Sequence, residues 1–384
     1  MDALKPKVLN GYHVVFLVQN VMIAMGLLSF PYQLSAVGYS QWWLPIFFGI
    51  IANVTIIPMI WLAGKYKEDS LFKIHEILFG RIMGKTINMV LIIIGCILMA
   101  ATVERYLEMI QLVAFPYRTL TGPLIMLMLV AVFIAKRGIK SVARFCIIAF
   151  FLTSPMVYLL RWGLEEGKIT HLLPLFNFTG KEFLAATKEG YSSIVGYELL
   201  MFYFPYIINQ KKVFKHASIG IWISIFFYFL ISMVSVIHFS EWQLKNVLYP
   251  VLNLFKYVEL SFLEKIDTIG ITFWVFLILS TVSAYLWVLK EGIESLRSKK
   301  HAAHLYIIAV IITVMVFIPL SQSQEEKIYG HAFYASYALI LWPNLLSLVH
   351  MIKSRKGRGS NDKSKMVYIC CLFNRLFRLY VGKR

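Results

Sequence analysis

Charged residues are scarce in this chain of 384 residues. Asp, Glu, Lys and Arg together make up 15% of it, whereas 59% of the residues are hydrophobic. The mean hydropathy of +0.69 is far above that of water-soluble domains. The composition excludes a soluble globular domain and predicts an all-α polytopic membrane protein.

Cysteine is rare as well, and the usual sequence motifs of enzymes are missing. The four cysteines, Cys96, Cys146, Cys370 and Cys371, do not have the spacing of metal ligands. The sequence contains no phosphate loop, nucleophile elbow or HExxH motif. We therefore predict no catalytic residue, no metal, no cofactor and no enzymatic activity.

Apolar stretches of about the length that crosses a bilayer, roughly 20 residues, are what the chain has instead. Ten of them can be marked, of which the fourth and the ninth are short. They lie near residues 11–36, 42–63, 86–108, 120–135, 144–161, 186–208, 217–238, 267–289, 305–320 and 331–351.

Lys and Arg are distributed unevenly between these stretches. With the N-terminus inside, 28 of the 38 Lys and Arg residues fall in cytoplasmic segments and nine in outer segments. The asymmetry predicts that both termini are cytoplasmic and that the number of spans is even. The net charge of +18 then indicates contact with anionic membrane lipids, and nucleic acid is not an expected partner. The basic tail, residues 353–384, fits either an interfacial helix or a disordered segment held near the membrane by its charge.

Helix-breaking residues interrupt two of the spans at corresponding places. The first span contains AMGLLSFPYQ (24–33), and we expect its helix to open between Gly26 and Pro31. Five spans later, YSSIVGYELLMFYFP (191–205) again has a glycine, Gly196, followed by Pro205. A simple kink is the alternative for either site alone. Interruptions at equivalent positions of two five-helix halves indicate an inverted-repeat transporter fold.

The combination of MIAMGLLSFP in the first span, GYE in the sixth and the overall length resembles a known family. The sequence is similar, over roughly residues 8–352, to the B subunits of the nutrient germinant receptors of endospore-forming bacteria. That family is related to the amino acid-polyamine-organocation transporters. The resemblance implies ten transmembrane helices in a five-plus-five inverted repeat of the LeuT type, with helices 1 and 6 broken. Repeat one would cover about 8–161 and repeat two about 186–352.

The resemblance also implies a role and partners. A small germinant, an amino acid or a sugar, would bind near the middle of the membrane. The protein would work in the spore inner membrane with a larger A subunit and a lipoprotein C subunit.

The ligand site itself is expected between the two breaks. The amides of an opened helix, at Gly26, Leu27, Leu28 and Ser29, suit a carboxylate or hydroxyl group. Ile194, Val195 and Gly196 would form the facing wall. Val195 would gauge the size of the ligand side chain, with ordinary packing as the alternative.

Polar residues elsewhere in the spans complete the predicted site. Thr281 and Tyr285 are four residues apart and share a helical face, although a Thr hydroxyl in a span often bonds only to its own helix. Glu104 and Glu198 are assigned to a polar pathway or to coupling, because ionisable groups in spans are costly. Ser283, which lies near Thr281 and Tyr285 in the sequence, is assigned with them. The alternatives are an interfacial position for Glu104 and a structural contact at a helix end for Glu198.

Three classes of function remain open from the sequence. The first is a receptor subunit that binds a germinant and signals through its partners. The second is a secondary transporter of amino acids or related solutes. The third is a scaffold, or a water-conducting or ion-conducting subunit, that retains a vestigial pocket.

Overall fold

The computed structural model describes residues 6–113, 117, 119–258, 266–297, 301–318, 322–325, 327–328 and 331–356. The described segments are almost entirely helical, and their bounds follow in chain order. The α-helices are α1 Gly11–Ile23, α2 Gly26–Gln33, α3 Leu44–Lys65, α4 Leu71–Phe79, α5 Arg81–Val113, α6 Thr121–Lys136, α7 Ile139–Thr153, α8 Arg161–Glu165, α9 Gly180–Ser192, α10 Leu200–Tyr203, α11 Val213–His238, α12 Glu241–Asn246, α13 Pro250–Lys256, α14 Ile266–Leu296, α15 Ala303–Phe317, α16 Gln322–Glu325 and α17 His331–Lys356. Short 3₁₀ segments join them: η1 Ser35–Trp43, η2 Ser154–Leu160, η3 Ile169–Leu172, η4 Tyr197–Leu199, η5 Phe204–Tyr206 and η6 Gln210–Lys212.

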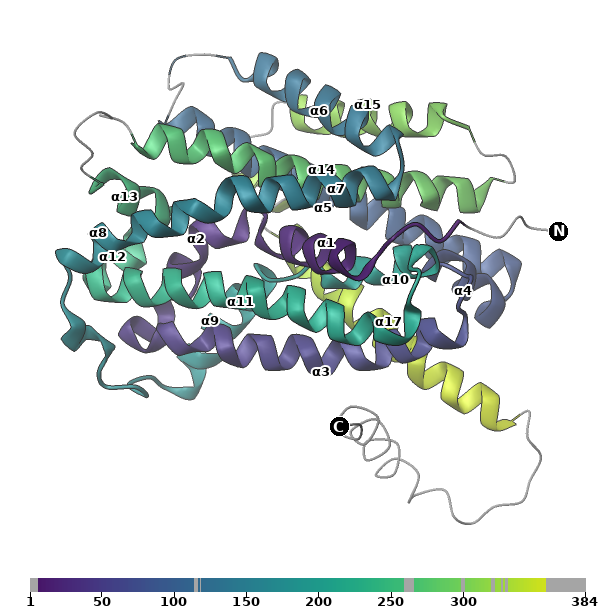
Figure 1. Ribbon diagram of the computed structural model, residues 1–384, viewed down its shortest axis with the longest axis horizontal. Coiled ribbons are helices and arrows are strands. Elements are labelled where there is room, and N and C mark those ends of the chain that lie inside the picture. The colour runs from purple at the N-terminus through teal and green to yellow at the C-terminus, as the bar shows by residue number, and fades with distance from the viewer. Residues whose placement is uncertain are drawn as a thin grey trace, which may run out of the picture.

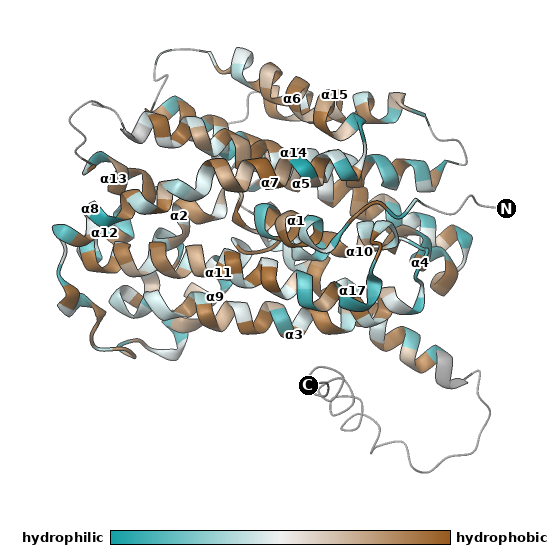
Figure 2. Ribbon diagram, in the orientation of Figure 1, coloured by the Kyte–Doolittle hydropathy of each residue, from teal (hydrophilic) through white to brown (hydrophobic). Residues whose placement is uncertain are grey.

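Over its described residues, each of the ten apolar stretches predicted from the sequence is mainly helical. Among the described residues, six helical segments are long and apolar enough to cross a membrane, and the bent pair α1 and α2 makes a seventh. Helices α6 and α15 are apolar but shorter, and the sixth stretch is divided among α9, η4 and α10. Hydrophobic residues run along the long helices, and hydrophilic residues gather at their ends (Figure 2). This distribution is that of an integral membrane protein.

Helix α1 lies in the middle of the bundle (Figure 1). It packs against α11 on one side and against α7 and α14 on the other. Ten of its thirteen residues are buried, including the polar side chains of His13, Gln19 and Asn20. A helix that is buried all round has no solvent-facing or lipid-facing stripe, so α1 is part of the protein core.

The first broken span bends by 50° between α1 and α2. The break lies at Ala24 and Met25, and Ala24 has the unusual backbone angles φ 28° and ψ −128°. The prediction that the turn between Gly26 and Pro31 opens is therefore wrong in position. Helix α2 is continuous through Pro31, the sixth of its eight residues, and the missing amide of that proline removes one hydrogen bond from the helix.

The second broken span is interrupted at Gly196. Helix α9 ends at Ser192, and the next helical turn, η4, begins at Tyr197. Gly196 has φ +136°, a conformation that side chains disfavour. A Cβ atom there would lie 2.7 Å from Cγ1 of Val21 and 2.9 Å from the Val21 carbonyl carbon. The second break therefore requires glycine and packs directly on α1.

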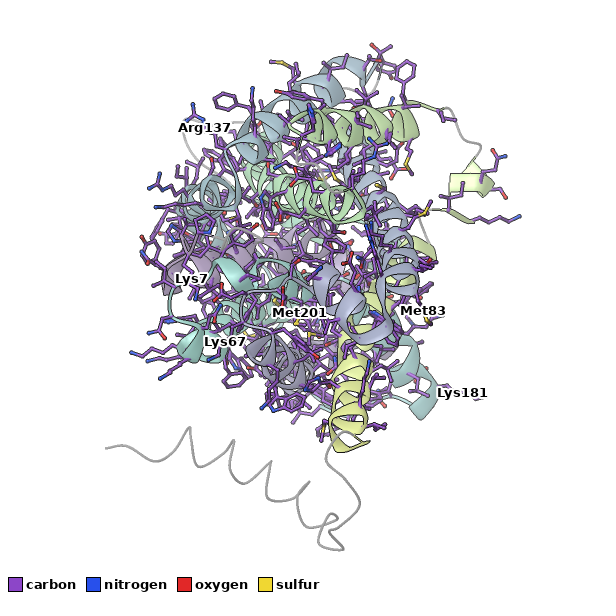
Figure 3. All side chains as sticks on the ribbon, turned by 90° about the vertical axis from the view of Figure 1, so that its right-hand side faces the viewer. Lys7, Lys67, Met83, Arg137, Lys181 and Met201 are labelled. Carbon is purple, nitrogen blue, oxygen red and sulfur yellow. The ribbon has the colours of Figure 1, made fainter. Side chains whose placement is uncertain are left out.

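One end of the bundle, called here the basic end, is where α1, α7 and α11 begin and α3 finishes. It carries Lys7, Lys65, Lys67, Lys136, Arg137, Lys140, Lys211, Lys212 and Lys215. Figure 3 looks onto this end, with Lys7, Lys67 and Arg137 at its margin. Helices α8, α12 and α13 lie at the opposite end (Figure 1).

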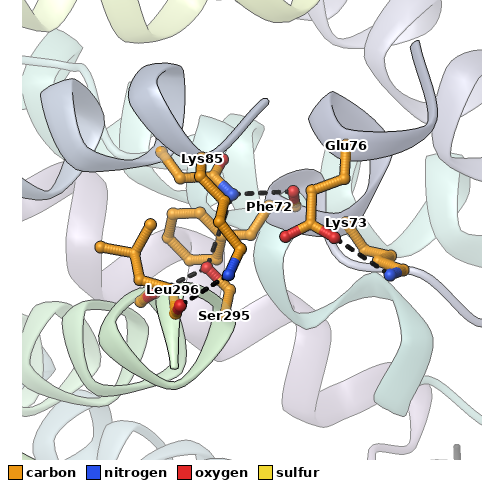
Figure 4. A network of polar contacts seen from close by, with 8 residues as sticks. Phe72, Lys73, Glu76, Lys85, Ser295 and Leu296 are labelled. Carbon is orange, nitrogen blue, oxygen red and sulfur yellow. Dashed lines mark hydrogen bonds and ion pairs between the residues drawn. The ribbon is translucent and has the colours of Figure 1, made fainter. Parts of the chain in front are cut away.

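Polar contacts fasten the chain at the basic end. Lys7 pairs with Glu68 at 2.8 Å, and the amide of Ile208 donates to the carbonyl of Leu9 at 3.0 Å. The ammonium of Lys85 donates to the carbonyl of Leu296 at 2.7 Å and so joins α5 to the end of α14 (Figure 4). These contacts tie the segment before α1 to the loops after α3 and α10, and α5 to the end of α14.

The exact boundaries of the two predicted repeats, about 8–161 and 186–352, and of the predicted tail, 353–384, remain predictions. Helix α17 extends the last span to Lys356. The rest of the predicted tail, residues 357–384, lies outside the described residues.

Candidate functional site

A cavity of about 330 Å³ lies between the two broken spans. Its walls come from α1, α2, α5, α9, α14, α17 and the segment before α13. It is lined by Val21, Ala24, Met25, Gly26, Ser29, Tyr32, Gln33, Leu98, Thr102, Arg105, Glu108, Glu189, Ser192, Ser193, Val195, Leu248, Tyr249, Thr281, Tyr285, Tyr334 and Ser336. Five of the residues predicted for ligand binding are among them: Gly26, Ser29, Val195, Thr281 and Tyr285.

The two broken spans meet tightly beside this cavity. A Cβ atom on Gly26 would lie 2.3 Å from the carbonyl oxygen of Ser193, so glycine allows the two backbones to touch. The hydroxyl oxygen of Tyr228 lies 2.9 Å from the carbonyl oxygen of Met22 and 2.7 Å from that of Ser193. Its one proton can serve only one of these acceptors at a time. Tyr228, on α11, thus bridges the two breaks.

A second polar contact joins the breaks on the cavity wall. The Ser193 hydroxyl donates to the side-chain carbonyl of Gln33. The side-chain nitrogen Nε2 of Gln33 in turn donates to the Ser29 hydroxyl at 3.2 Å. Ser29, which the sequence singled out, is therefore one member of a chain that crosses from α2 to the residue following α9.

The two breaks differ in how their backbone amides are satisfied. At the second break the amide of Gly196 donates to Oε2 of Glu198 at 2.7 Å. Glu198 is almost fully buried, and its other oxygen, Oε1, has no hydrogen-bond partner within the part of the chain that the structure describes. At the first break no side chain caps α2. The turn η4 after the second break has no side-chain cap either, so the difference between the breaks lies in the carboxylate on Gly196. In the first turn of α2 the Leu28 amide donates to the Met25 carbonyl at 3.3 Å, and helix geometry leaves the Gly26 and Leu27 amides without an intrahelical acceptor.

The wall formed by α14 is tied to α1 by hydroxyl groups. The Thr281 hydroxyl lies 3.1 Å from the carbonyl of Leu277 and 3.4 Å from that of Asn20. Ser280 donates to the Asn20 side chain at 3.1 Å. The predicted back-bonding of Thr281 to its own helix is present, and the residue also lines the cavity.

A charged cluster that the sequence interpretation missed lines the part of the cavity toward the opposite end. Arg105 and Glu108 come from α5, Glu189 from α9, and the phenols of Tyr249 and Tyr334 complete the group. All four of these partners lie close enough to Arg105 to act on it electrostatically. The α5 part of this cluster could have been predicted from helical spacing. Leu98, Thr102, Arg105 and Glu108 recur at intervals of three and four residues and so share one face of the helix.

The remaining predicted site residues do not line this cavity. Leu28 and Ile194 are buried in the core, and Leu27 faces a small apolar hollow near Phe150 and Trp274. Glu104 is adjacent to Arg105 on α5 but is not part of the lining. The hydroxyl of Ser283 donates to the carbonyl of Ala131 on α6, at 3.3 Å. Gly196 and Glu198 form the second break described above.

The cavity therefore offers two kinds of recognition. The uncapped turn of α2 favours a negative group, and the cluster around Arg105 presents charges of both signs. In the described residues, no group of three His, Cys, Asp or Glu side chains is placed to hold a metal ion. The arrangement suits reversible binding of a small polar or zwitterionic molecule.

Comparisons with known proteins agree with this architecture. A family model described as "Spore germination protein" matches residues 8–325. The chain is 24% identical over 347 residues to spore germination protein GerQB of Bacillus cereus, covering 87% of this chain and 94% of that protein. It is 23% identical over 360 residues to spore germination protein A2 of Bacillus subtilis (strain 168), covering 91% and 97%.

A solved structure shows the same fold. The crystal structure of MhsT in complex with L-phenylalanine superposes with a TM-score of 0.65 at 14% identity, over 90% of this chain and 89% of MhsT. The LeuT-type fold predicted from the two interrupted spans is thereby confirmed. With the family match over most of its length, the chain belongs to the spore germination protein family, the family that its first-span and sixth-span motifs resemble.

Proposed function

We propose that this protein is the nutrient-sensing subunit of a spore germinant receptor. A small germinant, best matched by an amino acid, binds in the cavity between the broken spans. Its carboxylate lies against the first turn of α2, and its ammonium group lies toward the carboxylates of Glu108 and Glu189. The volume of about 330 Å³ is at the small end of the range typical of ligand pockets, which fits a molecule of this size.

The observation that carries this proposal is the contrast between the two helix breaks. The Gly196 amide already has an internal carboxylate, from Glu198, whereas α2 has no side-chain cap. A ligand carboxylate would supply to α2 what Glu198 supplies at the second break. A sugar would lack this charged match and would rely on hydroxyl contacts alone.

Signalling follows from the position of the cavity between parts that can move relative to each other. A ligand that binds one arrangement of the two broken spans more tightly shifts the population toward it. We propose that the shift is passed to a larger A subunit and a lipoprotein C subunit in the spore inner membrane, with both termini of this chain cytoplasmic. Chemistry on the ligand is not part of the proposal.

The test is a germination assay on spores that carry single substitutions in this chain. Spores with Val195→Phe should lose the response to the nutrient that the wild type recognises, because the larger ring occupies the cavity. The matched control is Ile148→Phe, since Ile148 is exposed on the outer face of α7. Both proteins must be present at wild-type level in the inner membrane.

Two outcomes would change the assignment. An unaltered dose response in Val195→Phe spores would place the ligand elsewhere. Uptake of an amino acid by the purified protein alone in liposomes would favour the secondary transporter, the second class that the sequence left open.

A further inference from the structure

A groove on the membrane-facing surface of the bundle lies between α7 and α11. Its volume is about 660 Å³, and it is separate from the cavity between the broken spans. Lys215, Ile219, Trp222 and Phe226 of α11 line it at intervals of four, three and four residues, so they share one face of the helix. Phe150 of α7 lines it from the other side.

The lining is apolar and exposed for the length of one leaflet. Ile219 and Trp222 each retain 40% exposure and Phe226 retains 55%. From Lys215 to Phe226 the helix rises by about 17 Å, close to half the roughly 30 Å thickness of the hydrocarbon core. This length and the apolar lining match one extended acyl chain of a lipid in that leaflet.

Lys215, in the first turn of α11, lines one end of the groove, and three further cations lie at the same end of the bundle. Lys212, the last residue of η6, acts with Lys215 electrostatically on His216. Lys140 and Arg144 belong to α7 and act on His13 of α1. None of the four cations takes part in an ion pair between described residues. This arrangement of cations above an apolar groove complements a phosphate group that carries an acyl chain.

We propose that this groove is a binding site for an anionic phospholipid. The phosphate lies among Lys140, Arg144, Lys212 and Lys215, and one acyl chain runs along Trp222 and Phe226. Helices α7 and α11 both pack on α1, and Phe150 contacts Phe16 of α1 with ring centres 4.9 Å apart. The lipid thus stabilises the packing of α7 and α11 on α1, the first half of the first broken span. The site does not depend on the proposed germinant function.

The test uses Trp222 as its own probe. Full-length protein is reconstituted in phosphatidylcholine vesicles that contain a minor fraction of phosphatidylglycerol, and bromine is placed on the acyl chains of one lipid or the other. The difference in quenching between wild type and Trp222→Phe isolates the signal of this residue. Brominated phosphatidylglycerol should quench Trp222 more strongly than brominated phosphatidylcholine at the same mole fraction.

Substitutions then test whether the preference for phosphatidylglycerol depends on the lysines at the end of the groove. The pair Lys212→Gln and Lys215→Gln, both exposed, should lower the preference for phosphatidylglycerol by about fivefold for each lysine removed. The control pair Lys136→Gln and Arg137→Gln removes two cations at the same end, from α6 and the residue after it, and should leave the preference unchanged. Equal quenching by the two lipids, or an unchanged preference in the lysine pair, would overturn the site. Quenching by neither lipid would show another occupant and would also overturn it.

Discussion

Both helix breaks of this protein interrupt a membrane span, but different residues form them. The second break uses a glycine, Gly196, with φ +136°, and a buried carboxylate that accepts its amide. The first break uses an alanine, Ala24, with φ 28°, and no side chain caps the helix that follows. Neither α2 nor η4 has a side-chain cap, but at the second break a carboxylate of the protein accepts the Gly196 amide, and the first break has no such internal carboxylate among the hydrogen bonds of the described residues.

This difference separates a structural break from a binding break. A buried amide without a partner is costly, so it has to find an acceptor in protein, water or ligand. Glu198 fixes the second break whether or not a ligand is present. In the proposed function the first break gains an anionic acceptor from the ligand, which is why we place the ligand carboxylate there.

The largest expected effect is on stability, and it should distinguish the two breaks directly. Gly196→Ala should lower the free energy of unfolding by about 3 kcal/mol or more, because its Cβ would meet Val21 in a strained conformation. Ala24→Gly should stay within about 1 kcal/mol of wild type, since relief of strain offsets the added chain entropy. Thermal unfolding of the purified protein measures both. Equal losses in the two variants would remove the distinction.

A second effect concerns the close approach of the two spans. Gly26→Ala should cost about 2 to 3 kcal/mol and also impair nutrient binding, because its Cβ would meet the backbone of Ser193 at 2.3 Å. Gly64→Ala, in α3, is the control, since a Cβ there meets no atom within 4 Å. A Gly26→Ala protein as stable as the Gly64→Ala protein would show that the spans are not in contact. Gly26→Ala alone is consequently a poor probe of ligand contact.

The third prediction compares neighbouring charges on α5. Arg105→Gln should raise the nutrient concentration for half-maximal germination by about 10-fold to 100-fold, because it removes the cation that acts on Glu108 and Glu189, the carboxylates proposed to receive the ligand's ammonium group; this is the range expected when one interaction with a charged group is lost. Glu104→Gln should change it by less than about twofold, because Glu104 does not line the cavity. Dose-response curves of spores at matched protein level measure both. A larger effect from Glu104→Gln would instead support the polar pathway that the sequence assigned to it.

The fold was predictable because its signals are local and strong. Long apolar stretches follow from the thickness of the bilayer, and Gly26 and Gly196 lie five spans apart at equivalent places. The exact position of the first break was not predictable. Ala24 is an ordinary residue for a helix, and its unusual backbone angles arise from packing against other parts of the chain, including the indole of Trp274, which donates to its carbonyl at 2.9 Å.

The cavity was predictable only in part, for a related reason. Gly26, Val195 and Thr281 could be placed at its wall because they lie in or beside the two breaks or at mid-span. Arg105, by contrast, was not predicted to line the site, since the sequence does not show that Glu189 and Tyr334 from distant helices converge on it. Leu27 and Ser283 were assigned by proximity in the chain, yet their helical phase turns them away from the cavity.

The most direct test of the central claim compares two hydroxyl groups two residues apart on α14. Thr281 lines the cavity, whereas Ser283 faces α6. With single L-amino acids and simple sugars as nutrients, Thr281→Val spores should require about 3-fold to 10-fold more of the recognised nutrient. Ser283→Ala spores should respond as the wild type does. Equal dose responses of the Thr281→Val and wild-type spores, at equal protein level, would contradict a ligand site between the two broken spans.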